Sequence, residues 1–534
     1  MNQLGFPLLS AIIFVPVAGA LVTLLLGGNR PVIKIWALIV ALIDLALVCI
    51  LLALFDYGQA EMQFVDQFAW IEPLGISYTV GVDGISLWLL LLTALLTPVV
   101  VLVSWSFLDG RAESDARPFI FFLLTLEAGV LGVFAALDLI LFYIFWEAVL
   151  VPAYFLIGRW GGERRVHAAL KFFLYTMAGS ALMLVAIIVL AVLNYQQTGQ
   201  FTFDLFALYQ LPLPWLVQLG LFLAFILAFA VKAPIWPLHT WLPDAYEESP
   251  TPVTVLLAAV LSKMAIYGLI RFCLPLFPDA VAALRPWIWL LAIVGILYGS
   301  LIALAQQDMK RMVAYSSLAH MGMIVAGVFA VNAQGVDGAL VQSVSHGITV
   351  AALFILVGML ERRRGTRQID DLGGLWKSIP LFGTVLLTVV MASIGLPGLS
   401  GFPGEFTLLV GVFQESPVAA AFATLGIVLG AWYMLNFFRN AFAGALVRPE
   451  NRTLPDLRRH EIVILLPLLV LIFVIGILPN LIFFAADASV DLMLERAEDR
   501  RVVHMDSRDA YSWLGVADRP SVEVAHHDQP DRSP

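Results

Sequence analysis

Long apolar runs recur along the whole chain, and they limit its fold more than any other feature. Of the 534 residues, 61% are hydrophobic and only 13% are charged, whereas soluble proteins carry about 25% charged residues. A helical run of 18 or more apolar residues is long enough to cross the roughly 30 Å hydrocarbon core of a bilayer. A membrane barrel would instead show alternating segments of about ten residues. The sequence therefore predicts an all-α polytopic membrane protein.

The apolar runs divide the chain into about fourteen predicted spans. They cover residues 8–28, 33–55, 84–106, 118–136, 138–158, 168–193, 212–231, 252–273, 283–304, 311–331, 336–360, 380–414, 418–438 and 461–485. The predicted parts of the chain are three N-terminal helices (1–117), one five-helix repeat (118–273), a second five-helix repeat (283–438), a last helix (439–485) and a polar, outward-facing tail (486–534). We expect part of that tail to be disordered, because it is too polar to bury a core.

Lysine and arginine are distributed unevenly between the loops. The odd-numbered loops hold 20 of them, whereas the even-numbered loops and their helix ends hold only Arg271 and Arg285. Basic loops stay on the cytoplasmic side of a membrane. The odd-numbered loops are therefore predicted to be cytoplasmic, and an even number of spans places both termini on the outer side.

Motifs for cofactors are scarce in the sequence. The two cysteines, Cys49 and Cys273, lie in apolar runs without a CxxC neighbour, which argues against a disulfide framework or an iron–sulfur cluster. The sequence contains no phosphate-binding loop and no dinucleotide fingerprint. The first apolar run lacks a basic segment before it, so no cleavable signal peptide is expected. We predict a chain that holds no cofactor and no metal and binds no nucleic acid.

Ionisable side chains interrupt the apolar spans at a few positions. The deepest are two lysines, two glutamates and two histidines: Glu147, Lys232, Lys263, His320, His346 and Glu405. A charge at the centre of a membrane helix costs about 2.5–3.5 kcal/mol, so such residues persist where they pair or carry a function. Ion pairs that only hold helices together explain one Lys–Glu pair better than six groups on separate helices. Because a nearby carboxylate raises the proton affinity of a buried lysine, these groups are predicted to carry protons.

Two of the ionisable residues lie beside helix breaks. The segment VKAPIWP places Pro234 and Pro237 just after Lys232, and GLPGLSGFPGEF places Glu405 after a glycine-rich stretch. Proline removes a backbone donor and breaks a helix, and irregular backbone at membrane depth requires protein or water around it. Lys232 lies 173 residues before Glu405, and the same offset takes Glu147 to His320. This offset spans five helices, an odd number, and indicates inverted repeats with broken spans seven and twelve.

At these residues the sequence resembles a known family. The segments FYIFWEAVLVPAYFLIGRWGG, KAPIWPLHTWLPDAYEESPTPV, AYSSLAHMGMI, SVSHGI and GLPGLSGFPGEF are similar to the antiporter-like subunits of respiratory complex I, which are related to Mrp-type cation/proton antiporters. The resemblance covers nearly all of residues 80–480 and implies fourteen helices with inverted repeats at spans 4–8 and 9–13. Most members have lysine in broken span twelve, and the M-type has glutamate, as at Glu405.

The resemblance also implies a function. It places the proton-carrying roles on Glu147, Lys232, Lys263, His320 and His346, with Glu405 as the residue of the second break. The chain would be a proton-translocating subunit of NADH:quinone oxidoreductase, without a redox centre, driven by electron transfer in partner subunits. Its partners would be the other antiporter-like and quinone-side membrane subunits, membrane lipid and protons. It would reside in the bacterial cytoplasmic membrane, or in the thylakoid if it is cyanobacterial.

Other functions fit parts of the same pattern. A stand-alone Mrp-type antiporter subunit would use the same buried groups, and the D subunit of a ferredoxin-driven photosynthetic complex is also similar. His320 and His346 lie on consecutive spans and would suit a haem b, although Lys263 and the lack of a second histidine pair argue against it. The sequence shows no substrate-sized polar pocket that would indicate a solute transporter.

Overall fold

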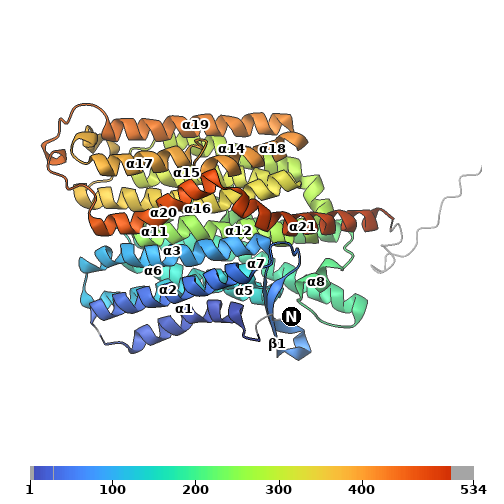
Figure 1. The fold of residues 1–534 in the computed structure, drawn as a ribbon. Helices are drawn as coiled ribbons and strands as arrows, with labels where there is room; N and C mark the ends of the chain where they lie inside the picture. Colours follow the sequence, from blue (N-terminus) through green and yellow to red (C-terminus); the bar gives the residue numbers. More distant parts are fainter. Residues whose placement is uncertain (1–4, 28, 507–534) are drawn as a thin grey trace, which may run out of the picture.

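A computed structural model of the chain describes residues 5–27 and 29–506. Its helices run side by side along one direction and form a single bundle (Figure 1). Helices satisfy their own backbone hydrogen bonds, which is what an apolar chain in lipid requires. The bundle confirms the predicted all-α class.

The first half of the bundle is built from helices that are mostly long and apolar. They are α1 (Leu8–Leu25), α2 (Arg30–Leu54), α3 (Gly84–Asp109), α4 (Ala116–Ala135), α5 (Leu139–Ala148), α6 (Leu150–Trp160), α7 (Arg165–Thr198), α8 (Leu205–Tyr209), α9 (Trp215–Lys232), α10 (Trp241–Glu248), α11 (Thr251–Leu256), α12 (Ser262–Gly268) and α13 (Leu274–Leu276). Helices α5 and α6 form one span that is interrupted at Val149, where Pro152 offers no donor to the carbonyl of Ala148.

The second half is also built from helices. Its helices are α14 (Pro278–Leu304), α15 (Met309–Val328), α16 (Ala333–Arg364), α17 (Pro380–Ser393), α18 (Gly401–Glu415), α19 (Pro417–Phe442), α20 (Arg459–Ile477) and α21 (Asn480–Asp506). In the described residues, 12 segments are long and apolar enough to cross a membrane. The less apolar α15 and the broken pair α17–α18 run among them (Figure 1), which accounts for the fourteen predicted spans.

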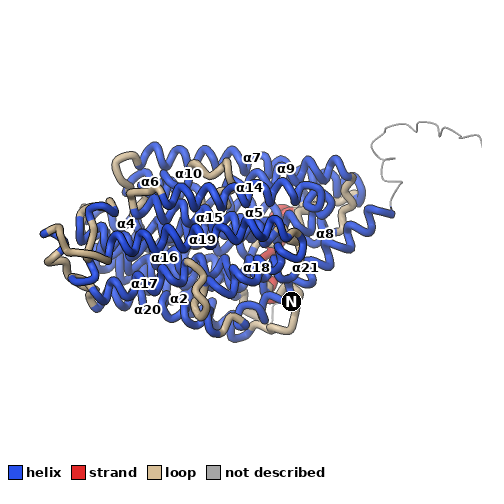
Figure 2. Tube along the Cα trace, turned by 90° about the horizontal axis from the view of Figure 1, so that it is seen from above, coloured by secondary structure: helices blue, strands red, loops and turns tan. Residues whose placement is uncertain are grey.

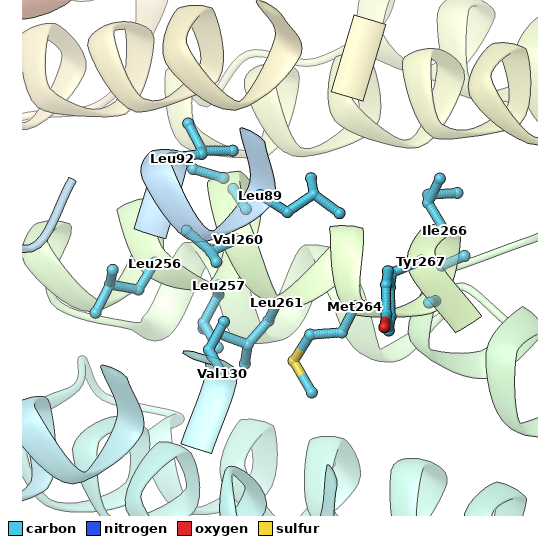
Figure 3. Close-up of a cluster of buried hydrophobic side chains, with 14 of the residues drawn as sticks. Leu89, Leu92, Val130, Leu256, Leu257, Val260, Leu261, Met264, Ile266 and Tyr267 are labelled. Carbon is cyan, nitrogen blue, oxygen red and sulfur yellow. The ribbon is translucent and has the colours of Figure 1, made fainter. Parts of the chain in front are cut away.

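Two spans form the centre of the bundle. The apolar stretches of the α11–α13 span and of α16 are buried along their whole length, whereas the peripheral helices expose one apolar side. Leucine, valine and methionine side chains from α3, α4, α11 and α12 interlock around the first of these spans (Figure 3). That span contains two π-helical turns, Leu257–Leu261 and Leu269–Cys273. The prediction of a regular helix over 252–273 did not include these wide turns.

A β-hairpin was not predicted from the sequence. Strands β1 (Gln63–Ile71) and β2 (Ile76–Val82) pair antiparallel between α2 and α3. They lie at one end of the bundle, the end that also carries the start of α1 (Figure 2). The hairpin leads directly into α3, whose first turn is capped by Asp83 through the amides of Ile85 and Ser86, both at 3.1 Å.

The first part of the predicted polar tail is helical. The last apolar helix ends at Ile477, and residues 480–506 form α21, which crosses the hairpin end of the bundle (Figure 1). Its backbone approaches α3 so closely that a Cβ added at Gly84 would lie 1.7 Å from the Ala485 carbonyl oxygen. Tertiary packing therefore orders a segment whose composition is polar. The remainder of the predicted tail, residues 507–534, lies outside the described residues.

Candidate functional site

The first helix break positions Lys232 at the end of α9. The helix stops at this residue because Pro234 and Pro237 follow it. The indole nitrogen of Trp241 donates to the carbonyl of Val231 at 2.8 Å and occupies one acceptor freed by the break. The predicted discontinuous span seven is therefore present.

Lys232 is buried among aromatic rings. Its ammonium lies 5.2 Å from the ring centre of Trp146 and 5.7 Å from that of Phe172, which are cation–π distances. Its side chain is only 1% exposed, and its nitrogen has no hydrogen-bond partner among the described residues. Because no hydrogen bond occupies the Lys232 ammonium, it is available to a proton donor or acceptor that comes within reach.

Glu147 acts electrostatically on Lys232. The two residues form no contact ion pair in the described part of the chain. The Tyr143 hydroxyl lies within hydrogen-bonding reach of the Glu147 carboxylate, and Ser180 faces the same hydroxyl. Tyr143 was not singled out from the sequence, although it lies one helical turn before Glu147 and thus on the same side of α5.

Lys263 and His346 make direct contact at the centre of the bundle. The Lys263 ammonium lies 2.7 Å from Nδ1 of His346, and it donates to the Ala258 carbonyl at 2.9 Å and to the Ser262 hydroxyl at 3.1 Å. Lys263 is fully buried and His346 is 3% exposed. The π-helical turn immediately before Ser262 widens the helix at this point, as is common at functional sites.

The contacts continue from His346 through His320 to Glu405. The two imidazole rings are tilted by 40° with centres 5.2 Å apart, which leaves no room for a porphyrin between them and contradicts the haem alternative. Nδ1 of His320 lies 3.3 Å from Oε1 of Glu405. Four ionisable side chains from α12, α16, α15 and α18 thus form one buried line, which we call the Lys263–Glu405 line.

The second helix break places Glu405 at the end of this line. Helix α17 stops at Ser393 and α18 begins at Gly401, so the predicted span over 380–414 is discontinuous. The amide of Gln342 donates to Oε1 of Glu405 at 2.9 Å. Gly395 adopts φ +71°, and a Cβ there would lie 2.5 Å from Oε2 of Glu405. The break therefore packs directly against the carboxylate. No feature of the sequence indicates the Gln342 contact.

Two cavities adjoin Glu405. A small one of about 10 Å3 also touches His320 and Tyr433, which is room for about one water molecule. The other, of about 440 Å3, is also lined by Gly395 and Phe406.

A separate cavity of about 280 Å3 lies beside the cation-rich loops, and none of the six predicted residues lines it. Its wall includes Glu247, Lys310, Glu361 and Arg367; we call it the vestibule. The Lys310 ammonium, buried at its wall, donates to the Ser249 carbonyl at 2.7 Å.

The six predicted residues therefore fall into two groups. Lys263, His346, His320 and Glu405 are joined by direct contacts. Glu147 and Lys232 form the other group, embedded among the aromatic rings of the first half. No contact is recorded between the two groups within residues 5–27 and 29–506.

Two family models match this chain between residues 13 and 430. The family described as NADH:quinone oxidoreductase/Mrp antiporter, TM, matches residues 136–430, and the amino-terminal family of NADH-ubiquinone oxidoreductase chain 4 matches residues 13–131. NADH-quinone oxidoreductase subunit M of Rhodobacter capsulatus is 43% identical over 493 residues, which cover 89% of this chain and 94% of the relative. The chain belongs to the NADH-quinone oxidoreductase subunit M family. Subunit M of Rickettsia prowazekii is 38% identical over 92% of this chain and 99% of its own length.

Solved structures agree with membership of the subunit M family. A chain of respiratory complex I from Thermus thermophilus with bound NADH superposes with a TM-score of 0.82 at 31% identity, covering 92% of this chain and 99% of that one. A chain of the Mrp complex from Dietzia sp. has a TM-score of 0.79 at 22% identity, covering 93% and 100%. The second likeness concerns the fold alone. Membership of the subunit M family confirms the resemblance identified from the sequence.

Proposed function

We propose that this chain translocates protons across the membrane as the subunit M of a proton-pumping NADH:quinone oxidoreductase. The observation that carries this proposal is the Lys263–Glu405 line, in which a buried ammonium, two neighbouring imidazoles and a carboxylate follow one another at short distances. Each of these groups gains or loses a proton without other chemistry. Electron transfer would take place in partner subunits, and this chain would contribute proton movement alone.

Proton movement along the line follows from the donor and acceptor atoms. With Lys263 charged, its ammonium would donate to His346 Nδ1, and the neutral ring would then carry its proton on the other nitrogen. When Nδ1 takes the lysine proton, the imidazolium can release the proton of its other nitrogen towards His320. His320 passes a proton to Glu405 in the same way, through the Nδ1 that faces the carboxylate. Neutral Lys263 is then ready to accept the next proton.

Protons would enter from the vestibule. It lies beside the loops that carry most basic residues, and its wall includes the buried Lys310 and the carboxylates of Glu247 and Glu361. Charged side chains in a water-accessible cavity concentrate and exchange protons readily. The breaks at Lys232 and Glu405 would supply carbonyls that hold the water needed inside the bundle.

Lys232 and Glu147 would control the line electrostatically. Because they are not in direct contact, a change in their separation changes how strongly they interact.

The architecture and location of the chain are also part of this proposal. The chain would consist of N-terminal helices and two inverted repeats, with Lys232 and Glu405 in equivalent places. It would reside in the bacterial cytoplasmic membrane, or in a thylakoid, with both termini on the outer side.

The partners would be the other membrane subunits of the same complex. Subunit M relatives take their name from such a complex. An Mrp-type antiporter subunit and the D subunit of a ferredoxin-driven complex remain the alternatives. Co-purification of the full-length chain with NADH-oxidising and quinone-reducing activities would favour the proposal, and purification with a sodium/proton exchange activity alone would contradict it.

The decisive experiment replaces Glu405 in the intact complex. Glu405→Gln keeps the shape of the side chain and its contact with Gln342 but removes titration, so NADH-driven dye quenching in inverted vesicles should fall at least tenfold. Assembly, followed on native gels, should not change. Glu415→Gln is the matched control, because Glu415 lies on the same helix as Glu405 but is exposed. Its carboxylate pairs with Arg285 at 2.8 Å. Wild-type pumping by an assembled Glu405→Gln complex would refute the proposal.

A further inference from the structure

Two carboxyl groups face each other outside the proton line. Asp44 lies near the middle of α2 and Glu127 near the middle of α4, and their side chains are within hydrogen-bonding reach of each other. Asp44 is 0% exposed and Glu127 is 1% exposed. Neither residue contributes to the site described above. Burying two acids at mid-membrane depth costs free energy, and a hydrogen bond, a cation or a bound proton must offset that cost.

The surroundings of the pair offer one hydroxyl. All four carboxyl oxygens of Asp44 and Glu127 lack a hydrogen-bond partner among the described residues. The Thr97 hydroxyl lies within reach of Glu127 and 3.1 Å from the Thr93 carbonyl, so its single proton does not satisfy both acids. Ionised carboxylates only accept hydrogen bonds. The only remaining way to form a hydrogen bond between these groups is a proton on one of them.

The surroundings offer no neutralising cation. Helix α1, which packs against both α2 and α4, has no ionisable residue. Ionisable residues on the elements in contact with α2 or α4, and on these two helices themselves, are, besides the pair, Arg30, Lys34, Cys49, Tyr78, Asp109, Glu113, Asp115, Arg117, Tyr143, Glu147, Tyr154, Arg159, Lys263 and Tyr267. Of the cations, Lys34 binds Asp109, Arg159 binds Asp115 and Lys263 contacts His346. No cation lies within 4 Å of the pair in the described chain.

We propose that Asp44 and Glu127 together bind one proton, forming a carboxyl–carboxylate hydrogen bond that joins α2 to α4. Two negative charges at this separation in a water-free interior repel strongly, so they do not both stay ionised. One proton removes that repulsion: the O–H of one acid donates to an oxygen of the other, and the pair keeps a single negative charge. The site is a proton-binding site separate from the Lys263–Glu405 line.

A metal cation fits the same oxygens less well. Hard cations take about six or more oxygen ligands, and the pair supplies four carboxyl oxygens with the Thr97 hydroxyl beside them. No group of three or more metal-ligating side chains is found in residues 5–27 and 29–506. The shared proton would therefore fasten the N-terminal helix α2 to α4, the first helix of the predicted pumping repeats.

Infrared spectroscopy of the intact complex tests the shared proton. A protonated carboxylic acid gives a C=O stretching band that shifts in D2O, whereas an ionised one does not. Asp44→Asn and Glu127→Gln each supply an amide N–H that replaces the proton, so the remaining acid ionises. We expect each single variant to lose the same one band and the double variant to lose no more. Glu498→Gln, which removes an exposed carboxylate of α21, should leave this band unchanged.

Three outcomes would overturn the proposal. Loss of no band in either single variant would mean that both acids are ionised. A loss of two bands in the double variant would mean that each acid holds its own proton. A band that appears only when sodium is removed would indicate a cation site. If the amide variants do not assemble, the exchanged pair Asp44→Glu/Glu127→Asp should keep the band at a shifted position, and an unshifted spectrum would count against the pair.

Discussion

The ammonium of Lys263 and Nδ1 of His346 lie 2.7 Å apart, and both side chains are buried. At this distance a single proton can reside on either nitrogen, and the charges and dipoles around the two groups decide on which. The lysine comes from α12 and the histidine from α16, the two spans that form the centre of the bundle. This contact joins the first half of the chain to the second.

Lys263→Arg should abolish most pumping, although it retains the positive charge. Arginine does not release its proton in proteins, so His346 would receive none. We expect at least a tenfold loss of NADH-driven proton uptake in inverted vesicles. Lys377→Arg, an exchange at an exposed position, is the control and should pump normally. Wild-type activity in Lys263→Arg would exclude proton release from this side chain.

Glu147→Gln should slow pumping because it removes the negative charge that acts on Lys232. Without that charge the buried lysine loses the acid that acts on it. We expect a several-fold loss of pumping in an assembled complex and a smaller loss in Tyr143→Phe. Glu163→Gln changes an exposed carboxylate on the neighbouring loop and should have no effect. Equal pumping by Glu147→Gln and the control would separate Glu147 from Lys232.

Gly395→Ala should disturb Glu405 through direct contact. Alanine at φ +71° is strained, and its Cβ would meet Oε2 of Glu405 at 2.5 Å. Gly398→Ala is the matched control: φ is +89°, but nothing lies within 4 Å of its Cβ. Both changes should cost about 1–2 kcal/mol of stability from backbone strain. Only Gly395→Ala should also impair pumping, which vesicle assays and thermal unfolding would separate.

Arg500→Ala should loosen α21 from the rest of the protein. Burial lowers the pKa of this guanidinium to about 10, so it remains charged at neutral pH. It donates to the carbonyls of Tyr209 at 3.2 Å and Pro275 at 3.3 Å, and also to those of Leu208 and Leu211. Hydrogen bonds from a charged group contribute roughly 1.5–3 kcal/mol.

Limited proteolysis measures this loosening. Cleavage within α21 should become at least tenfold faster in Arg500→Ala than in the wild-type complex. Arg501→Ala removes the next side chain, which is 48% exposed and 4.0 Å from Asp279, and should leave cleavage unchanged. An unchanged rate in Arg500→Ala would show that the apolar contacts of α21 suffice to hold it.

Many features of this protein depend only on local sequence. Span number follows from apolar length, because crossing a bilayer requires about 20 residues wherever they occur. The breaks after Lys232 and before Glu405 follow from proline and glycine, whose backbone limits act on their own segment. The six ionisable residues stood out because a charge in an apolar run is costly whatever its neighbours are.

Tertiary structure decided which of these residues meet. Nothing in the sequence indicates the rotation that turns Lys263 towards His346 or Asp44 towards Glu127, since helix rotation is set by packing against several neighbours at once. The same packing holds the β-hairpin in place and orders α21. The polar composition of α21 does not by itself predict an ordered helix. Apolarity acts residue by residue and can be read along the chain, whereas a contact between buried polar groups depends on the placement of two helices that are distant in sequence.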